Sequence, residues 1–486
     1  MSVRKIVVNT VIIGGGHAGC NLACWLQEAA AAAAAAGSTP RSYVVLERNP
    51  TPLHRWRAGR WTDFQLNTPV KYSRLHAQED DRDDQLLDRP LADDLSRWDA
   101  HLEKMGVKVR CNTSVTRVCK LSSVEARGGD GAGDAESPCF ATTAVDTSLG
   151  EQLLFESRNV VVCSGAYNDE KVPRDLAAKL PATIKQHTPV GFDAGCLGSG
   201  ALLIVGGGQT GYQIADLLLD NKCSDSTSRD IYICVSASGG APRTLRGRDL
   251  FYWLEEMKFL SIPQEALAGM PPPVAASLRY SHPPVTGPNK AISPFSCYRK
   301  GAKLLGRLID VKVTANAGGD GNSDTPAAAG RVAIVLAPDR AKCLNALVLS
   351  YTGIAAKIDG FINEWVTKNG GEEATGVPLE SDMPEPEWQD PEKELLNETG
   401  PLEVDATAAG ITDVLWATGY SANLSFLEGL PEVAAEYDEK THLPQHLESP
   451  STPGLFFLGF PWLGTQQSQN LVGFDADQAV IMQRLR

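Results

Sequence analysis

The chain of 486 residues is long enough for two or three domains with sizeable hydrophobic cores. Its 45 basic and 59 acidic residues leave a formal net charge of −14, which argues against nucleic acid or an anionic membrane surface as a partner. No apolar run reaches the roughly 18 residues of a membrane span, and eleven cysteines without a secretory leader predict reduced thiols in a cytoplasmic protein.

Residues 6–19, IVVNTVIIGGGHAG, predict a buried strand, a tight turn and the start of a helix. In such a turn Gly14 permits the sharp bend, Gly16 lets a pyrophosphate approach the backbone, and Gly19 lets helix and strand pack closely. The free N–H groups at the helix start would face the phosphates. We therefore predict a dinucleotide site here, with a purely structural glycine turn as the alternative.

A second predicted strand, Ser42–Leu46, ends in Glu47, the acid expected to bind a ribose hydroxyl, and we assign the adjacent Arg48 to the same site. Glu47 comes later than the usual spacing of about 20 residues. The eight alanines Ala29–Ala36 explain this delay, because they lengthen the intervening helix before Gly37 ends it.

Cys20 and Cys24 share one face of that predicted helix. A redox pair of the disulfide-reductase kind is one interpretation. Cysteines four residues apart on a helix are poorly placed for disulfide closure, so we predict instead that both pack against the sheet as small buried residues.

Residues 54–64 are rich in arginine and aromatic side chains, Trp61 among them, and lead into Leu66-Asn67-Thr68-Pro69. Trp and Arg supply flat surfaces that stack and bind phosphate, and Pro69 holds Thr68 in an extended conformation. We predict that Trp61 and Thr68 contribute to a cofactor site. An ordinary surface loop with cation–π pairs is the alternative.

The following segment predicts an amphipathic helix at 91–105, then a small β-meander, then a buried strand at 159–166 that ends in small residues. Such a meander is common in FAD-binding domains. Its strands are expected at 107–111, 115–118, 140–145 and 152–155, with the Gly/Asp-rich residues 127–138 as a loop.

Residues 201–215, ALLIVGGGQTGYQIA, repeat the strand, glycine turn and helix pattern. The predicted cofactor contacts of this second copy are Gly206, Gly208, Gln209 and Gly211. Two such patterns about 190 residues apart favour one FAD and one nicotinamide dinucleotide, each in its own domain.

The strand after the second copy, Ile231–Val235, ends in Ser236-Ala237-Ser238 where an acid would be expected. Arg243, Arg246 and Arg248 follow. A carboxylate would repel a 2′-phosphate, whereas hydroxyls and guanidinium groups would bind it, so the pattern favours NADPH over NADH. We predict that Arg243 or Arg246 contacts this phosphate.

The predicted fold is α/β with two Rossmann-like dinucleotide-binding domains. Residues 1–172 and 405–486 form the FAD-binding domain, and residues 173–404 form an inserted NADPH-binding domain. The remaining expected elements are a loop at 318–330, a helix at 359–367, a linker at 372–402, strands at 411–416 and 455–460, and a closing helix at 474–485.

Four motifs, Gly14–Gly19, Leu66–Thr68, Gly206–Gly211 and Trp416–Tyr420, together resemble the class B flavin-dependent monooxygenases, a group that includes flavin-containing, N-hydroxylating and Baeyer–Villiger enzymes. Within this group the chain is most similar to bacterial-type flavoproteins associated with cation-efflux genes. With Asp475, an expected cofactor contact, the likeness runs from about residue 8 to 483. It includes residues 60–69 (RWTDFQLNTP), 181–214, 245–254 (LRGRDLFYWL) and 455–468 (LFFLGFPWLGTQQS).

One motif departs from the family. Class B enzymes carry Phe-x-Gly-x-x-x-His, and an aromatic residue four positions later, before the second glycine turn. Here His187 holds the histidine position, whereas Pro181, Thr183 and Gly191 replace the other residues. A functional role and a surface role for His187 both stay open.

The resemblance implies an NADPH-dependent FAD monooxygenase, in which NADPH reduces the flavin and a C4a-(hydro)peroxyflavin formed with O2 oxygenates a small substrate at nitrogen, sulfur or a carbonyl group. It implies a catalytic role for Asn67 near the flavin, while a purely turn-forming role stays open. The alternatives are an NAD(P)H-dependent flavoprotein reductase or oxidase without oxygen insertion, and a non-catalytic flavin-binding redox sensor. No metal site is expected, and substrate identity and oligomeric state are not predicted.

Overall fold

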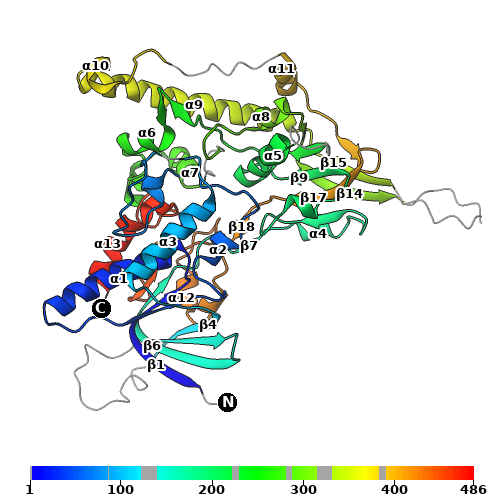
Figure 1. Ribbon diagram of the computed structural model, residues 1–486. Coiled ribbons are helices and arrows are strands. Elements are labelled where there is room, and N and C mark those ends of the chain that lie inside the picture. Colours follow the sequence, from blue (N-terminus) through cyan, green and yellow to red (C-terminus); the bar gives the residue numbers. More distant parts are fainter. Residues whose placement is uncertain are drawn as a thin grey trace, which may run out of the picture.

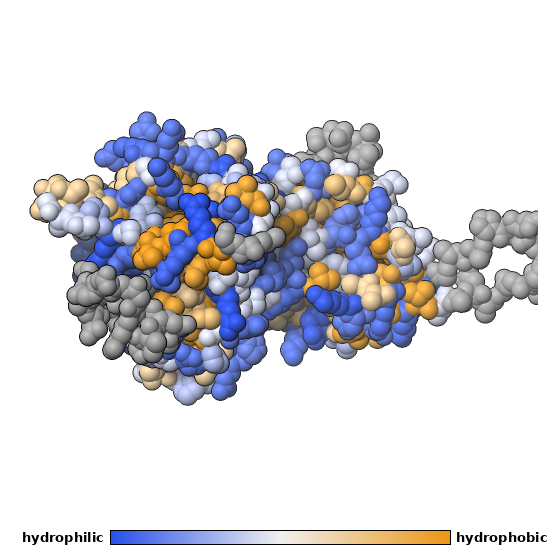
Figure 2. Space-filling view, turned by 90° about the horizontal axis from the view of Figure 1, so that it is seen from below, coloured by the Kyte–Doolittle hydropathy of each residue, from blue (hydrophilic) through white to orange (hydrophobic). Residues whose placement is uncertain are grey.

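The computed structural model describes residues 3–85, 87–121, 139–221, 229–280, 287–314, 331–381 and 390–485. The loops expected at 127–138 and 318–330 lie outside these ranges. The chain forms two lobes, each built around a sheet with helices against it (Figure 1). In Figure 2 the first-sheet lobe lies at the left and the second-sheet lobe at the right. No helix of the described ranges is long and apolar enough to cross a membrane.

The first sheet has the strand order β3-β2-β1-β6-β5-β4, and β19 pairs with β6. Four pairings among β3, β2, β1, β6 and β19 are parallel, whereas β4, β5 and β6 are joined antiparallel as the expected meander. The strands are β1 (Arg4–Ile13), β2 (Tyr43–Leu46), β3 (Val109–Arg110), β4 (Thr113–Lys120), β5 (Phe140–Asp146), β6 (Glu151–Val162) and β19 (Leu455–Phe457).

Strand β6 differs from expectation, because two strands were predicted at 152–155 and 159–166 and the structure has one of 12 residues. Its pairing with β1 runs from Leu153 to Val162 and holds the intervening polar residues in the ladder. The first half of β6 also pairs with β5. Two neighbours on opposite edges therefore keep this segment extended, a tertiary effect that local sequence does not report.

Both faces of the first sheet are covered. Ile12 points to a cluster that includes α1 (His17–Ala35) and α13 (Phe474–Arg484), whereas Val11 and Ile13 point to the opposite cluster around Phe155. This alternation is the period of two of a strand buried on both sides. Helix α1 contains the predicted alanine run and ends before Gly37, which has a φ of +71°. The amphipathic α3 (Leu91–Met105) forms where it was expected.

The second sheet is parallel throughout, with the order β13-β10-β9-β17-β8. Strand β17 (Ile411–Trp416) was expected in the last part of the first domain, but it lies in this sheet between β9 and β8. The second sheet therefore contains a strand from beyond residue 404. The other strands are β8 (Lys185–His187), β9 (Ala201–Val205), β10 (Ile231–Cys234) and β13 (Lys303–Leu305).

Helices cover the second sheet on the side of α5 (Gln209–Asn221) and α8 (Pro294–Arg299), and β14 (Leu308–Thr314), β15 (Arg331–Leu336) and β16 (Glu403–Asp405) form an antiparallel sheet on the other. The helix expected at 359–367 is the end of the 29-residue α9 (Arg340–Lys368). Within the expected linker 372–402, α10 (Glu372–Thr375) and α11 (Asp390–Asn397) contact α9.

Short elements connect these layers. They are α2 (His54–Arg57), η1 (Val70–Ser73), β7 (Asp169–Glu170), α4 (Arg174–Ala177), η3 (Ala194–Cys196), β11 (Thr244–Leu245), β12 (Arg248–Asp249), α6 (Leu250–Glu256), η4 (Gln264–Gly269), α7 (Pro272–Tyr280), β18 (Tyr420–Ser421), η5 (Ser425–Leu427), α12 (Pro431–Ala434) and η6 (Leu471–Gly473).

Candidate functional site: two glycine turns

The first glycine turn, Gly14–Gly19, joins β1 to α1. Gly14 has a φ of +113°, and a Cβ at this position would lie 2.6 Å from the carbonyl oxygen of Cys163. A Cβ on Gly19 would overlap the carbonyl oxygen of Gly14, whereas one on Gly16 would meet no atom within 4 Å. Two glycines therefore serve backbone packing, and Gly16 borders open space at the start of the helix.

The second glycine turn, Gly206–Gly211, joins β9 to α5 with the same geometry. Gly206 has a φ of +122°, and its Cβ would overlap the carbonyl oxygen of Ala417. A Cβ on Gly211 would overlap the carbonyl oxygen of Gly206, and one on Gly208 would meet nothing within 4 Å. The two turns are thus structural counterparts, each packed against the end of a neighbouring parallel strand. Gln209 begins the helix of the second turn.

The residue that follows the next strand differs between the turns. The buried Glu47 accepts a hydrogen bond from the Gly15 N–H at 2.8 Å through Oε2, and bonds from Asn49 through Oε1. In the second turn, a Cβ on Gly207 would lie 2.5 Å from the Ser236 backbone nitrogen. By register Val235 is the counterpart of Glu47, because Val205 pairs with Cys234 as Ile13 pairs with Leu46. Ser236 follows it and lies beside Gly207, so the second turn has a neutral hydroxyl at its side where the first has a carboxylate.

His17 lies at the start of α1, inside the first glycine turn. Its ring is buried, packs edge-on against Trp98 with centroids 4.8 Å apart, and has Nε2 3.3 Å from the carbonyl oxygen of Ser73. Burial lowers the pKa of His17 to about 4, so the ring is neutral at pH 7. Its Nδ1 has no partner among the described residues.

Two further hydroxyls near the first turn are buried without a hydrogen-bond partner in the described part of the chain. One is Thr68 Oγ1, from the predicted Asn-Thr-Pro segment. The other is Ser164 Oγ, next to the Cys163 carbonyl that packs on Gly14. Buried hydroxyls without partners are costly unless a ligand or water satisfies them. Like His17 Nδ1, each is a buried polar atom that a bound polar ligand could satisfy.

Asn67 connects the two lobes. Its Oδ1 accepts a hydrogen bond of 3.0 Å from Nε2 of Gln213, which lies on α5 behind the second glycine turn. The adjacent η1 contacts η6, which leads into α13 beside the first turn. Asn67 thus lies where elements that belong to both turns meet.

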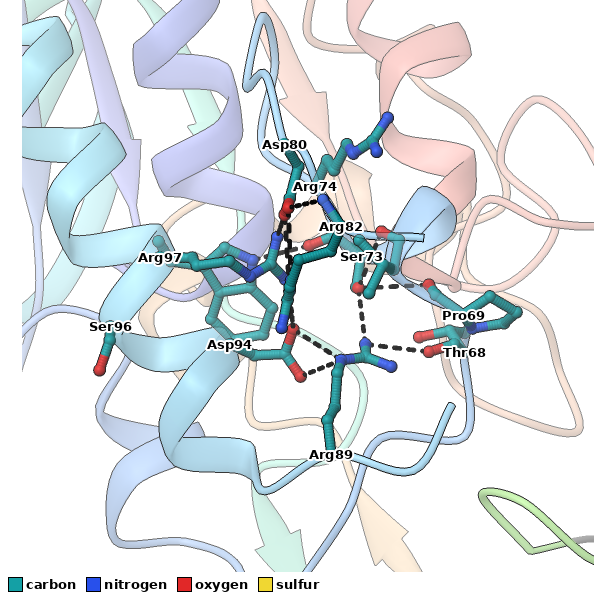
Figure 3. A network of polar contacts seen from close by, with 12 residues as sticks. Thr68, Pro69, Ser73, Arg74, Asp80, Arg82, Arg89, Asp94, Ser96 and Arg97 are labelled. Carbon is teal, nitrogen blue, oxygen red and sulfur yellow. Dashed lines mark hydrogen bonds and ion pairs between the residues drawn. The ribbon is translucent and has the colours of Figure 1, made fainter. Parts of the chain in front are cut away.

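A buried charge network, which the sequence analysis did not detect, holds the Asn-Thr-Pro segment in place (Figure 3). Arg89 Nη2 donates to the Thr68 carbonyl at 3.0 Å and to Ser73 Oγ at 2.9 Å, while its Nε donates to Asp94 at 2.8 Å. Burial lowers the pKa of Arg89, and the Asp94 carboxylate opposes this shift. Arg97 binds both Asp80 and Asp94.

No local pattern could have identified Arg89, because it lies 21 residues from Thr68 in the chain. The contact exists only because α3 packs beside η1. In a site that must orient a ligand, such fixed backbone support is as important as the contacting side chains.

The other residues predicted for the first cofactor are more scattered. Trp61 is buried and packs with residues of α5, including Tyr212, in the core of the second lobe. Arg48 is exposed. Asp475 is also exposed, and its Oδ1 accepts a hydrogen bond of 3.0 Å from Asn21 on α1. Asp475 therefore lies one turn of helix from the first glycine turn.

Arg243 and Arg246, predicted to contact a 2′-phosphate, are buried in ion pairs. Arg243 Nε lies 2.8 Å from Asp249, and Arg246 Nη2 lies 2.6 Å from Asp359. Arg246 also donates to the Asn363 side chain and to the Pro378 carbonyl oxygen. Burial lowers the pKa of Arg243, although Asp249 opposes the shift. These bonds are oriented into the protein, while Arg243 Nη2 is buried without a hydrogen-bond partner among the described residues, and a phosphate contact of either arginine stays a prediction.

His187 lies on the edge strand β8, where its Nε2 is 2.8 Å from Oδ1 of the fully buried Asp413 on β17. Burial acts to raise the pKa of Asp413, but hydrogen bonds from Thr412, His187 and Gly198 outweigh it and lower the pKa. His187 therefore anchors β8 to the second sheet.

Cys20 and Cys24 are both free and fully buried in one apolar cluster with Trp98 and Leu66. Burial raises the pKa of both thiols, which disfavours the reactive thiolate. The prediction that both are small buried residues is confirmed, but their apolar neighbours come mainly from α3 and the segments before it and not from the sheet.

No family model matches this chain. Among curated proteins, the uncharacterized oxidoreductase CzcO of Bacillus velezensis is 21% identical over 266 residues, which span 54% of this chain and 64% of that protein. The match therefore covers less than two thirds of the relative's length.

Solved structures match over nearly the whole chain. A flavin-containing monooxygenase from Stenotrophomonas maltophilia is 15% identical with a TM-score of 0.52, each chain being 98% covered. The cadaverine monooxygenase DfoA of Erwinia amylovora, a complex with FAD, is 12% identical with a TM-score of 0.53, with 99% of this chain and 94% of DfoA covered.

The bacillithiol disulfide reductase Bdr of Bacillus cereus is 14% identical with a TM-score of 0.50, with 99% of this chain and all of Bdr covered. At these identities the likeness concerns the fold. The chain is a mixed α/β protein with parallel and antiparallel sheets, and it shares its fold with flavoprotein monooxygenases.

Proposed function

We propose that this protein is a flavin-dependent monooxygenase that binds FAD at the first glycine turn and NADPH at the second, in two Rossmann-like domains. The observation that carries the proposal is the pair of matching turns joined by the Asn67–Gln213 hydrogen bond. The likeness in fold to the Stenotrophomonas enzyme and to DfoA supports it.

The residues at the first turn fit FAD. Gly16 leaves room for a pyrophosphate at the start of α1, and Glu47 offers acceptors for a ribose hydroxyl beside it. His17, Thr68 and Ser164 each present a buried polar atom without a partner among the described residues. Arg48, Trp61 and Asp475 stay proposed contacts of this cofactor. When bound, the flavin would accept hydride from the nicotinamide and react with O2.

The residues at the second turn fit NADPH better than NADH. Gly208 borders open space as Gly16 does, and the side chain beside Gly207 is Ser236, where the acid Glu47 lies beside Gly15 in the first turn. The buried Ser238 Oγ has no partner in the described ranges and is available as a donor to a phosphate. A neutral, hydroxyl-bearing position does not repel a 2′-phosphate, whereas a carboxylate would.

Asn67 would orient the reacting groups, because it lies where the two lobes meet and Gln213 fixes its amide. With Gln213 donating to Oδ1, the Asn67 NH2 group points elsewhere and can donate to a ligand. Arg89 holds the backbone of this segment through the Thr68 carbonyl. The protein's task is thus orientation and the exclusion of water, while the cofactors carry the chemistry.

The fold likeness to the reductase Bdr keeps a reductase without oxygen insertion as a second candidate. Against disulfide chemistry, Cys20 and Cys24 are buried with raised pKa values. A redox-sensing flavoprotein without turnover is a third candidate.

The test is to measure the flavin content of the purified protein, the anaerobic loss of flavin colour on addition of NADPH, and product formation after O2 is admitted. We expect bound FAD, reduction by NADPH, and transfer of isotopically labelled oxygen to an amine, sulfide or ketone of a substrate panel. Asn67→Ala should keep FAD and reduction but release hydrogen peroxide in place of product. Peroxide without labelled product across the panel favours the reductase or oxidase, and failure of NADPH to reduce the flavin favours the redox sensor.

A further inference from the structure

Arg60 is a cation without an acidic partner in the described part of the chain. Its guanidinium lies over the rings of Trp56 and Phe64, at 4.3 and 5.0 Å from their centroids, and its buried Nε has no hydrogen-bond partner among the described residues. Burial and the charge of Arg55 lower the pKa of Arg60 to about 10, although Tyr420 opposes them. Contact with aromatic faces stabilises a desolvated cation by only about 1–2 kcal/mol, which is less than the attraction of a paired carboxylate.

Arg60 is half-buried, whereas three fully buried arginines of the same region each have a carboxylate. Arg89 pairs with Asp94, Arg243 with Asp249 and Arg246 with Asp359. Arg60 differs from these three arginines because no described carboxylate pairs with it. An anion from outside the chain would therefore neutralise its charge.

A second guanidinium lies beside it. Arg55 faces the Tyr420 ring, with its Cζ 5.6 Å from the centroid, and its Nη2 donates to the Tyr167 carbonyl at 3.4 Å. No described acid forms an ion pair with Arg55 either. A bound anion between or beside two neighbouring cations lowers their mutual repulsion and so stabilises the charged form of both.

This arginine pair is close to two segments that continue from the strands packed on the two glycine turns. Tyr167 follows the Cys163–Ser164 segment that packs on Gly14, and Tyr420 follows the Ala417–Thr418 segment that packs on Gly206. The two continuations pair with each other as β7 and β18. Arg55 contacts both continuations, because it bonds to the Tyr167 carbonyl in one and faces the Tyr420 ring in the other.

We propose that Arg55 and Arg60 form a binding site for an anionic phosphate group, and specifically for the pyrophosphate of the dinucleotide held at the second glycine turn. This rests on the proposed function for the identity of the dinucleotide. The first lobe would then contribute to nicotinamide nucleotide binding through a segment far from Gly206 in sequence, so that the bound nucleotide bridges the lobes. A carboxylate of the substrate is the other source of the same chemistry.

The experiment measures binding of NADP⁺, NAD⁺ and inorganic pyrophosphate to the FAD-loaded protein by calorimetry, for the wild type, Arg60→Gln, Arg55→Gln and Arg60→Lys. Arg57→Gln is the matched control, because Arg57 is on the same segment but already pairs with Asp99. Loss of a charge-assisted contact should weaken binding of NADP⁺ and NAD⁺ equally, by about tenfold or more for Arg60→Gln. Arg60→Lys should recover part of the affinity.

Four results would decide the matter. Equal weakening for both dinucleotides and for pyrophosphate, with unchanged FAD content, supports the site. Selective weakening for NADP⁺ would assign the pair to the 2′-phosphate. Unchanged dinucleotide binding with weakened binding of acetate, titrated in the same way, would assign it to a substrate carboxylate. Either of these overturns the pyrophosphate assignment, as does unchanged binding of every ligand. A wild-type protein that binds FAD but no dinucleotide contradicts the proposed function itself, a result distinct from all of these.

Discussion

The two glycine turns have one backbone design and two different chemical settings. In each, a glycine with positive φ packs on the carbonyl group at the end of a neighbouring strand, and the third position borders open space. The differences are in the side chains around this frame. Glu47 lies beside Gly15 and His17 begins the helix at the first turn, whereas Ser236 lies beside Gly207 and Gln209 begins the helix at the second.

The comparison separates two kinds of requirement. Backbone packing demands glycine at the same positions in both turns, whatever is bound. The residues that differ can be exchanged between the turns without touching that packing. Substitutions at the two kinds of position should therefore have different consequences. The largest effect is expected for the glycines that the turns share.

Gly14→Ala and Gly206→Ala should each lower the free energy of unfolding of their lobe by about 2–4 kcal/mol, because the added Cβ meets a carbonyl group and φ is positive. Gly16→Ala and Gly208→Ala are the controls, since their Cβ atoms enter open space. These should keep their stability within about 1 kcal/mol but bind the corresponding cofactor more weakly. Thermal unfolding and cofactor titration check both. Equal destabilisation by all four substitutions would contradict the division into packing and binding glycines.

An arginine-rich segment follows each turn, but Arg243 and Arg246 after the second turn are buried in ion pairs with carboxylates, whereas Arg55 and Arg60 after the first form no ion pair among the described residues. Arg246→Gln should destabilise the protein by about 3 kcal/mol, because it leaves the Asp359 carboxylate with a weakened network. We expect the KM values for NADPH and NADH to change by the same factor. Arg248→Gln, which loses only a hydrogen bond to the Thr375 carbonyl, is the milder control. A selective rise in the KM for NADPH at unchanged stability would instead restore the 2′-phosphate role predicted from the sequence.

His17 gives the first turn a sensitivity to acid that Gln209 does not give the second. Its pKa is about 4 in the folded protein, below the ordinary value of 6.5, so the unfolded chain binds the proton more tightly. Stability is then fully present above pH 6.5 and is lost as pH falls from 6.5 to 4, by about 2–3 kcal/mol. His17→Gln, which copies the second turn, should flatten the unfolding profile in that window. A profile identical to that of the wild type would show that other groups control the acid response.

Exchange of the strand-end residue should have the smallest effect. Ser236→Glu places a carboxylate beside Gly207, where a 2′-phosphate is proposed, so the ratio of kcat/KM for NADPH to that for NADH should fall about tenfold, or by about 1.4 kcal/mol. Ser236→Gln adds similar volume without charge and should change the ratio far less. If both variants lower it equally, steric crowding rather than charge is the cause.

Some features of this protein could be predicted from local sequence alone. The two glycine turns, the helix at 91–105 and the helix lengthened by alanines follow from short-range rules about φ angles, helix periodicity and capping. These rules involve residues close in the chain, and so they need no knowledge of the fold. The burial of Cys20 and Cys24 follows from the same periodicity.

Other features depended on contacts between distant segments. β6 is continuous because β1 and β5 hold it from both sides, and β17 joins the second sheet although it lies close in sequence to elements of the first. Arg89 reaches the Thr68 carbonyl, and Arg246 reaches Asp359, across separations of 21 and 113 residues. The sequence around an arginine does not show whether the folded protein places a carboxylate next to it. The tertiary structure alone decided which arginines are neutralised within the protein and which, like Arg60, have no described carboxylate beside them.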